Sequence, residues 1–232
     1  MPQLLSRKNS FTILFLITGL SVQVAAYLWM PGNPWALVSG LLGICSVVLC
    51  SEGNILTFIF GFGQIITYTY LCYLERFYAG IAMNVFYFLS QIYGIYCWRK
   101  RLAPTGEAGP TAKRSDSEAI TITTRSLRTN VVIALLLSLL ACSLLVGWLL
   151  SRYTNDTQPY LDALTTVPAI AAQILMVMAF REHWYIWLMI DILYVVLWVR
   201  AENYCMVMQY AFWCINCVYG FIRWTQAQQS RA

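Results

Sequence analysis

The sequence predicts an all-α, polytopic membrane protein, and three observations support this fold class. First, 59% of the 232 residues are hydrophobic and only 11% are charged, whereas a soluble domain carries charge on about a quarter of its residues. Second, long apolar runs such as residues 131–150 do not alternate in polarity, which excludes the strands of a membrane β-barrel. Third, two stretches on either side of a polar linker resemble each other.

Eight apolar runs approach the length of about 17 to 25 residues that a helix needs to cross a bilayer. They occupy residues 11–30, 35–50, 55–74, 78–98, 131–151, 160–180, 184–200 and 204–224. The first run follows Arg7 and Lys8 and ends near Ala25 and Ala26, which also fits a cleaved signal peptide. Whether residues 1–30 are retained in the mature protein therefore stays open.

Basic residues are distributed unevenly about these eight crossings. Of the 15 Lys and Arg residues, Arg76, Arg152 and Arg200 fall on one side and all others fall on the opposite side. Because Lys and Arg accumulate in cytoplasmic loops, both termini are expected in the cytoplasm. The net charge of +5 is explained by this topology and by contact with membrane lipid, so no nucleic-acid partner is expected.

The polar linker separates two similar regions. Residues 99–130 are rich in Ser, Thr, Gly, Pro and charges of both signs, which is typical of a flexible cytoplasmic linker. A shift of 126 positions aligns YAGIAMNVFYFLSQIYGIYCW (78–98) with YCMVMQYAFWCINCVYGFIRW (204–224) without a gap, and both stretches contain YG-x3-W. This constant offset indicates an internal duplication.

The duplication predicts two parallel three-helix repeats joined by one transmembrane helix (3+1+3), plus an extra N-terminal helix. The joining helix is needed because a second copy with three crossings would otherwise be inverted in the membrane. The predicted parts are an extra helix at 1–34, a first repeat at 35–98, the linker at 99–130, the connecting helix at 131–151 and a second repeat at 160–224. Transporters with parallel repeats bind their substrate between the halves, near the membrane midplane.

Asp191 is the one ionisable residue far from the ends of any apolar run. A charge at the bilayer centre costs about 2.5 to 3.5 kcal/mol on insertion scales. No Lys or Arg lies at a comparable depth to form an ion pair with it. Two interpretations remain: a protonated carboxyl in a hydrogen bond between helices, or a carboxylate that meets a ligand.

Aromatic and amide side chains accompany this aspartate. Trp184, Trp187, Asp191 and Tyr194 are spaced by three, four and three residues, which places them on one helix face. A Trp near a segment end, as at position 184, is also typical of a membrane-interface anchor. Further amides lie inside apolar segments, where they either line a cavity or hold helices together; they include Gln64, Asn84, Gln91 and Asn216.

These residue types favour a flat, polar and cationic ligand. Aromatic faces stack on a ring and attract a positive charge, amides bind hydroxyl groups, and a carboxylate binds a cation or a sugar hydroxyl. A phosphate needs Lys or Arg partners or helix-end amides, so phosphorylated ligands should be rejected. The eight cysteines lie in apolar runs and the chain has a single histidine, so we expect no metal site and no cofactor.

The motif HWYIWLMID (183–191), followed by Tyr204 and YGFIRW and matched by QIYGIYCW earlier in the chain, resembles the PnuC family of bacterial nicotinamide riboside transporters. The resemblance covers residues 35–224. It implies a facilitator of the bacterial inner membrane with a 3+1+3 core similar to that of SWEET sugar transporters. It also implies a homotrimer, and substrate that is trapped in the cell by phosphorylation.

In that family pattern, Trp184, Trp187 and Asp191 form the motif and Tyr204 is its downstream tyrosine. Position 65, the counterpart of Asp191, is Ile, so the two halves cannot contribute equally. The predicted substrate-binding residues are Trp184, Trp187, Asp191, Tyr194, Tyr204, Gln64, Asn84, Gln91 and Asn216.

Other functions remain as alternatives. A transporter of a related vitamin such as thiamine would use the same cationic, aromatic chemistry. An assembly subunit would explain the hydrophobicity but not a polar cavity. An enzyme would need a nucleophile, paired acids or a metal cluster, and none is evident, so the chain is not expected to be an enzyme. No G-x4-G-K-[ST] loop occurs, which excludes ATP-driven transport by this chain alone; ion coupling through Asp191 stays open.

Overall fold

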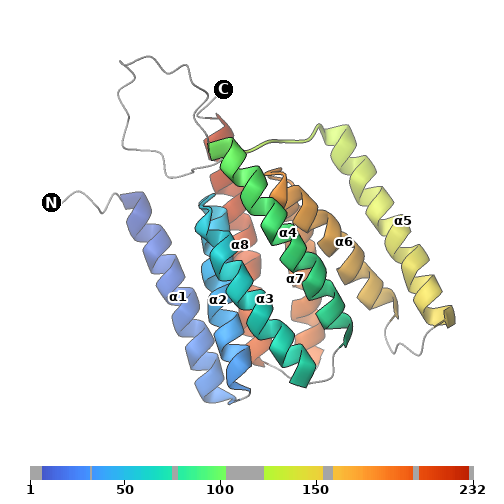
Figure 1. Ribbon diagram of the computed structural model, residues 1–232, viewed down its shortest axis with the longest axis horizontal. Coiled ribbons are helices and arrows are strands. Elements are labelled where there is room, and N and C mark those ends of the chain that lie inside the picture. The colour runs from blue at the N-terminus through green and yellow to red at the C-terminus, as the bar shows by residue number, and fades with distance from the viewer. Residues whose placement is uncertain are drawn as a thin grey trace.

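The fold is known from a computed structural model that describes residues 7–31, 33–74, 78–102, 123–153, 159–200 and 204–229. These residues form a bundle of helices that stand side by side (Figure 1). The helices are α1 (Arg7–Trp29), α2 (Pro34–Ser51), α3 (Leu56–Leu74), α4 (Tyr78–Leu102), α5 (Thr129–Tyr153), α6 (Pro159–Val177), α7 (His183–Arg200) and α8 (Tyr204–Gln229). No strand occurs among the described residues, so the all-α prediction is confirmed.

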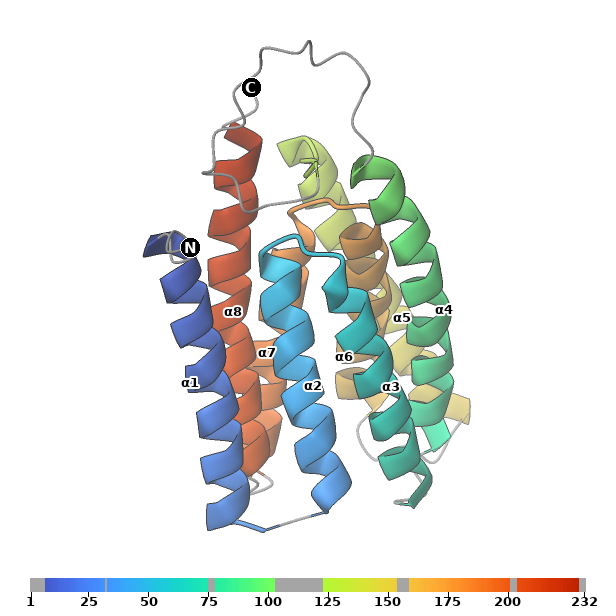
Figure 2. The ribbon, with the colours of Figure 1, turned by 60° about the vertical axis from the view of Figure 1, so that its left-hand side comes forward.

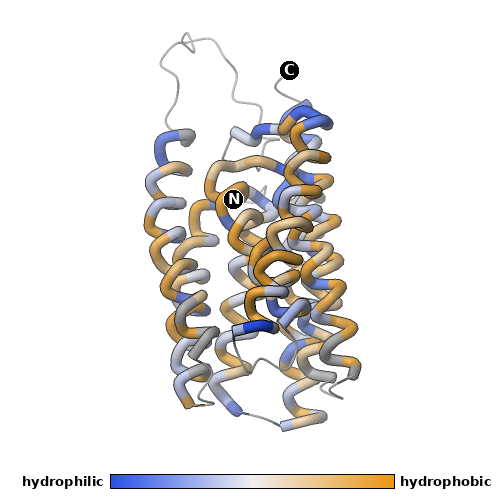
Figure 3. Tube along the Cα trace, turned by 90° about the vertical axis from the view of Figure 1, so that its right-hand side faces the viewer, coloured by the Kyte–Doolittle hydropathy of each residue, from blue (hydrophilic) through white to orange (hydrophobic). Residues whose placement is uncertain are grey.

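Helices α1, α2, α5 and α6 are long and apolar enough to cross a membrane by length and hydropathy. The described apolar parts of α3 (Leu56–Leu71) and α7 (His183–Val196) are shorter, whereas α4 and α8 are more polar, and blue patches interrupt the orange of the tube in Figure 3. Their polar residues include those predicted to line a binding site. The more polar composition of α4 and α8 is the expected consequence of facing a polar interior.

Two groups of three helices make up the centre of the bundle. The first half comprises α2, α3 and α4, and the second half comprises α6, α7 and α8. Shifted by 126, each bound of the first three helices falls within one residue of the corresponding bound of the last three. The halves meet where α2 packs on α8 and where α4 packs on α6, while α1 packs on α2 and α8, and α5 packs on α6.

The end of the bundle at which α2, α4, α6 and α8 finish is called the linker end here; Figure 2 shows α4 and α8 reaching it together. Its centre is aromatic. The Phe58 ring lies edge-on to Trp98, with centroids 4.8 Å apart, and the Trp184 ring lies edge-on to Trp224 at 5.8 Å. Trp98 and Trp224 are fully buried, and their rings approach each other to 6.0 Å.

This packing explains the repeated YG-x3-W motif. A Cβ atom at Gly220 would lie 2.5 Å from the Trp184 ring, and a Cβ at Gly94 would collide with Phe58 in the same way. The glycine thus makes room for a ring from the neighbouring helix of its own half, and the tryptophan four residues later fills the centre of the linker end. Burial of such large side chains contributes strongly to stability.

The structure changes several predicted boundaries. Helix α6 ends at Val177 instead of 180, because Ala179 has a positive φ of 57° that turns the chain toward α7. Helix α4 continues to Leu102 and α8 to Gln229. The predicted linker at 99–130 is therefore shortened at both of its ends, since α5 already begins at Thr129.

The last part of the linker is docked onto the bundle. Arg125 donates its backbone N–H to the Ala179 carbonyl at 2.8 Å, and its own carbonyl accepts from the Arg181 N–H at 3.0 Å. Thr124 donates its hydroxyl to the Trp224 carbonyl at 3.2 Å. The expectation of a wholly free tether is wrong for these residues, because helix ends supply backbone groups that need partners. Residues 103–122 lie outside the described ranges.

Candidate functional site

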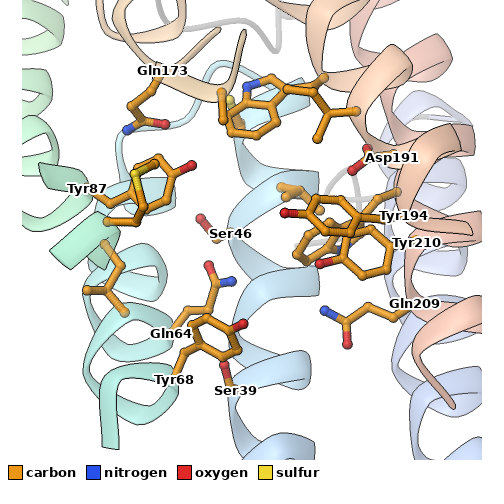
Figure 4. A pocket seen from close by; sticks show the side chains of 18 of the residues that line it. Ser39, Ser46, Gln64, Tyr68, Tyr87, Gln173, Asp191, Tyr194, Gln209 and Tyr210 are labelled. Atoms are coloured by element: carbon orange, nitrogen blue, oxygen red, sulfur yellow. The ribbon is translucent and has the colours of Figure 1, made fainter. Parts of the chain in front are cut away.

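A central cavity of about 370 Å³ lies between the two halves. All six helices of the halves contribute to its wall, whereas its described lining includes no residue of α1 or α5. Figure 4 shows Asp191, Tyr194, Gln209 and Tyr210 on one side, Gln64, Tyr68 and Tyr87 on the opposite side, and Ser39 and Ser46 of α2 between them. The volume is of the size that small-molecule sites have.

Asp191 lies in this wall and is 3% exposed. Its Oδ2 accepts a hydrogen bond from the Cys217 thiol at 3.5 Å, a weak interaction. Neither of the two ion pairs between described residues includes it. A buried carboxyl with one weak donor retains acceptor capacity for a ligand, which is the second of the two interpretations that the sequence left open.

Aromatic rings flank the carboxyl on the same face of α7. Trp187 and Tyr194 both line the cavity, one turn before and one turn after Asp191. The Tyr194 ring stacks on Tyr210 of α8, with centroids 4.7 Å apart and planes 21° apart. Trp213 lies edge-on to Tyr210 at 5.1 Å. This side of the cavity therefore presents an aromatic wall next to a carboxyl group.

Trp184 is not a membrane-interface anchor. It is 4% exposed and packs between His183 and Trp224, and it also borders the cavity. Its indole N–H is buried without a hydrogen-bond partner in the described structure. Trp184 therefore lies between the cavity and the aromatic centre of the linker end.

His183, the single histidine, is fully buried beside Trp184 and also borders the cavity. Its Nδ1 lies 2.7 Å from the Phe180 carbonyl oxygen, so Nδ1 carries the proton in this arrangement. Its Nε2 is buried and has no partner among the described residues.

The predicted amides fall into two groups. Asn84 Nδ2 and Gln91 Oε1 line the cavity and are buried without a partner in the described residues. An unpaired buried polar group costs about 1 to 3 kcal/mol, so both groups favour a ligand that pairs with them. Gln64 also lines the cavity, on the wall opposite Asp191 (Figure 4).

Asn216 borders the cavity but differs from the other amides, because its side chain is already paired. Its Oδ1 accepts from the Ser51 hydroxyl at 3.0 Å, and its Nδ2 donates to the Val47 carbonyl at 3.2 Å. It holds α8 against α2 in this conformation. Helix α8 begins at Tyr204, whose side chain lies outside the described part of the structure. Substrate binding by the nine predicted residues stays a prediction.

Sequence reasoning missed several lining residues. The aromatic ones are Tyr68, Tyr87, Tyr210 and Trp213. Tyr68 is the counterpart of Tyr194 under the 126-residue shift, and Tyr87 lies one turn after Asn84, so the repeat and the helix period could have identified both. Asp162, in the first turn of α6, is a second carboxylate on the wall. No Lys or Arg is present in the described lining, which makes the cavity electrostatically suited to cations.

Comparison with known proteins agrees with this architecture. Residues 33–226 match the family of nicotinamide mononucleotide transporters. The nicotinamide riboside transporter PnuC of Neisseria mucosa is 28% identical over 223 residues, which cover 93% of this chain and 81% of the relative. PnuC of Haemophilus influenzae is 29% identical, with coverage of 93% and 90%. PnuC of Escherichia coli is 24% identical, with coverage of 84% and 86%.

A solved structure has the same fold. The crystal structure of the vitamin B3 transporter PnuC aligns with a TM-score of 0.76 at 25% identity, covering 96% of this chain and 93% of that one. These relatives are named as transporters, which agrees with the expectation that the chain is not an enzyme. Because the family match extends from residue 33 to residue 226, the chain belongs to the nicotinamide mononucleotide transporter family, the family of PnuC-type membrane transporters that the HWYIWLMID motif predicts.

Proposed function

We propose that this protein takes up nicotinamide riboside across the bacterial inner membrane by facilitated diffusion. The observation that carries the proposal is the aromatic wall beside Asp191, in a cavity whose described lining has no Lys or Arg. Nicotinamide riboside joins a flat, positively charged pyridinium ring to a ribose. A buried carboxyl and aromatic faces attract such a ring, and unpaired amides suit the ribose hydroxyls.

We propose one orientation for the ligand in the cavity. The pyridinium ring lies against Trp187 and Tyr194, with its positive charge near Asp191. The ribose then points to α4, where Asn84 Nδ2 offers a donor and Gln91 Oε1 offers an acceptor. Tyr204 is proposed to complete the aromatic side at the start of α8, in keeping with its place in the family pattern.

The same cavity disfavours phosphorylated forms. A nicotinamide mononucleotide carries a phosphate, which needs cationic partners or several backbone N–H groups. The described wall offers Asp162 and Asp191 instead, and two carboxylates would repel the phosphate. We therefore assign the riboside, as named for the relatives, in preference to the mononucleotide of the family description. Phosphorylation inside the cell would then trap the product.

Transport is proposed to proceed by alternating access between two parallel repeats in a 3+1+3 plan. The shared helix bounds of the two halves support it, as does a cavity built by six helices with α5 as the connector. Both termini are proposed to lie in the cytoplasm, because most Lys and Arg residues fall on that side. The homotrimer implied by the resemblance is part of the proposal, and the mass of the complex in detergent tests it.

Isothermal titration of the purified protein with three ligands tests the substrate. We expect nicotinamide riboside to bind, its 5′-phosphate to bind at least about tenfold more weakly, which corresponds to roughly 1.4 kcal/mol, and thiamine to bind more weakly than the riboside. A preference for thiamine would assign the protein to another vitamin, and tight binding of the phosphate would refute the rejection argument. Binding of none of them would favour an assembly subunit.

Uptake into proteoliposomes tests the mode of transport. Facilitated diffusion predicts that internal riboside rises to the external concentration and stops there, with or without a proton or sodium gradient. Accumulation above the external concentration under an imposed gradient would show ion coupling through a group such as Asp191 instead. Vesicles without protein give the background rate.

A further inference from the structure

The two contacts between the halves correspond under the 126-residue shift, and each contains an equivalent tryptophan hydrogen bond. The α2–α8 contact is called the first seam here and the α4–α6 contact the second seam. In the first seam, Trp224 donates its indole N–H to the Cys50 carbonyl at 3.1 Å. In the second, Trp98 donates to the Met176 carbonyl at 3.3 Å. Each tryptophan therefore ties its own half to the other half at the linker end.

The first seam holds additional buried polar bonds. Arg223 of α8 forms an ion pair with Glu52, which directly follows α2, and both side chains are nearly buried, at 12% and 11% exposure. The Tyr219 hydroxyl donates to the same carboxylate. Ser51 and Asn216 add the hydrogen bond described above. Separating α2 from α8 would strand an uncompensated charge on each side, which is strongly unfavourable.

The second seam has no equivalent of this ion pair. The positions that correspond to Glu52 and Arg223 are Met178 and Cys97, and neither side chain can form one. Besides the Trp98 bond, a side-chain hydrogen bond from Gln173 Nε2 to Ser90 Oγ at 2.8 Å crosses the second seam. Parting α4 from α6 breaks these two neutral hydrogen bonds, whereas parting α2 from α8 also separates a buried ion pair.

The outer helices reinforce this difference. Helix α1 packs on both α2 and α8 and so spans the first seam. Its Phe15 ring stacks on Phe212 of α8 with centroids 4.8 Å apart, and its Thr12 hydroxyl donates to Glu52 at 2.9 Å. Helix α5 packs on α6 but makes no contact with α4 in the described ranges, and Figure 1 shows it apart from α4. No described helix spans the second seam.

We propose that the two seams have different roles: the first seam is a fixed hinge, and the second seam is the gate through which the cavity opens at the linker end. The Trp98 to Met176 hydrogen bond is the closing bond of this gate. Met176 lines the cavity, so parting of α4 from α6 at this point connects the cavity to the aqueous phase. This inference rests on the proposed transport function, but the asymmetry of motion is testable without any substrate.

Distances between paired spin labels test the inference in lipid nanodiscs. Native cysteines are first replaced by Ser or Ala. One pair, Lys100→Cys with Met178→Cys, reports the second seam; the other, Leu56→Cys with Gln226→Cys, reports the first. All four positions are exposed at or near the linker end. Trp98→Phe removes the closing N–H and keeps a ring, and Trp224→Phe is the matched control in the first seam.

We expect Trp98→Phe to add a population at longer distance for the Lys100 and Met178 pair, and Trp224→Phe to leave the Leu56 and Gln226 pair unchanged. Equal lengthening of both pairs by their respective substitutions would show two symmetric gates and overturn the inference. So would an unchanged Lys100 and Met178 distance in Trp98→Phe.

If Trp98→Phe does not fold, the two label pairs are compared in protein that keeps both Trp98 and Trp224. The gate pair should then show a broader distance distribution than the hinge pair, and equal widths would overturn the inference. Because no ligand is added, an error in the proposed substrate cannot produce either result. Failure of the gate and failure of the substrate assignment are therefore distinguishable.

Discussion

The two halves share a helix plan but differ in what they present to the cavity. On α7 the second half places Trp187, Asp191 and Tyr194, while the corresponding positions on α3 are Gly61, Ile65 and Tyr68. On α4 the first half places Asn84 and Gln91, while the corresponding positions on α8 are Tyr210 and Cys217. The second half thus supplies both carboxyl groups and most of the aromatic surface, while amides line the cavity from both halves.

This difference between the lining residues of the two halves indicates an asymmetric ligand. A cavity with identical halves would offer two equivalent poses, and a single molecule would occupy one of them at random. With both carboxyl groups and most of the aromatic rings on one wall, a ligand that is cationic at one end and hydroxylated at the other binds in a single pose. The two halves therefore differ in the polarity that they present to the cavity, although their helix bounds correspond.

Making the two halves alike at position 65, the counterpart of Asp191, gives the largest expected effect. Ile65→Asp introduces a second deep carboxyl group opposite Asp191, without a cationic partner. By insertion scales this costs about 3 kcal/mol, so the thermal unfolding temperature in detergent should fall markedly. Ile65→Leu is the control that keeps an apolar side chain. An unchanged unfolding temperature in Ile65→Asp would show that the first-half wall tolerates charge as the second does.

The reverse change removes the carboxylate from the second half instead of adding one to the first. Asp191→Asn keeps the size of the side chain but removes the negative charge, and a hydrogen bond or contact to a charged group contributes about 1.5 to 3 kcal/mol. Affinity for nicotinamide riboside should fall by about tenfold to a hundredfold in a titration. Unchanged affinity would mean that Asp191 is neutral and serves only to join α7 to α8 through Cys217.

The aromatic wall is expected to contribute less. Trp187→Ala removes a ring face whose attraction for a cation is about 0.5 to 2 kcal/mol, so affinity should fall by about threefold to thirtyfold. Trp148→Ala on α5, whose side chain is exposed outside the cavity, is the matched control and should bind as the native protein does. Equal losses in the two variants would indicate a general effect on folding instead of a local contact.

Removal of a single amide, Gln91 on α4, is expected to give the smallest effect. Gln91→Ala removes one unpaired acceptor, which corresponds to a net loss of about 0.5 to 1.5 kcal/mol for one hydrogen bond. The loss should appear for the riboside but not for a ligand that lacks the ribose, such as nicotinamide with an N-methyl group. A similar loss for both ligands in titration would place the ribose on another wall.

Sequence reasoning was most successful where a residue type conflicts with its surroundings. Asp191, Asn84 and Gln91 stand out in apolar segments because burying them costs free energy. The structure places all three in the lining of the same cavity. Tyrosines did not stand out in this way. Tyr68, Tyr87 and Tyr210 are common residue types in membrane helices, so their facing the cavity depends on helix rotation, which composition does not determine.

Polarity alone also failed to separate a cavity amide from a structural one. Asn216 is as deep and as polar as Gln91, yet its amide is satisfied by Ser51 and Val47 from a helix far away in the chain. Likewise, Glu52 and Arg223 lie at segment ends, where charges are ordinary, and only the tertiary structure brings them together. Pairing across large sequence separations is the part of this fold that a single sequence did not reveal.

The pairing of Glu52 with Arg223 has a consequence for biosynthesis. Helices enter the membrane in order from the N-terminus, so Glu52 emerges long before α8, which supplies its partner. Until the last helix has been inserted, the carboxylate near the end of α2 has no counterion from α8. The ion pair therefore forms only after the last helix has been inserted, and α2 and α8 become fixed to each other at the linker end in the final step of assembly.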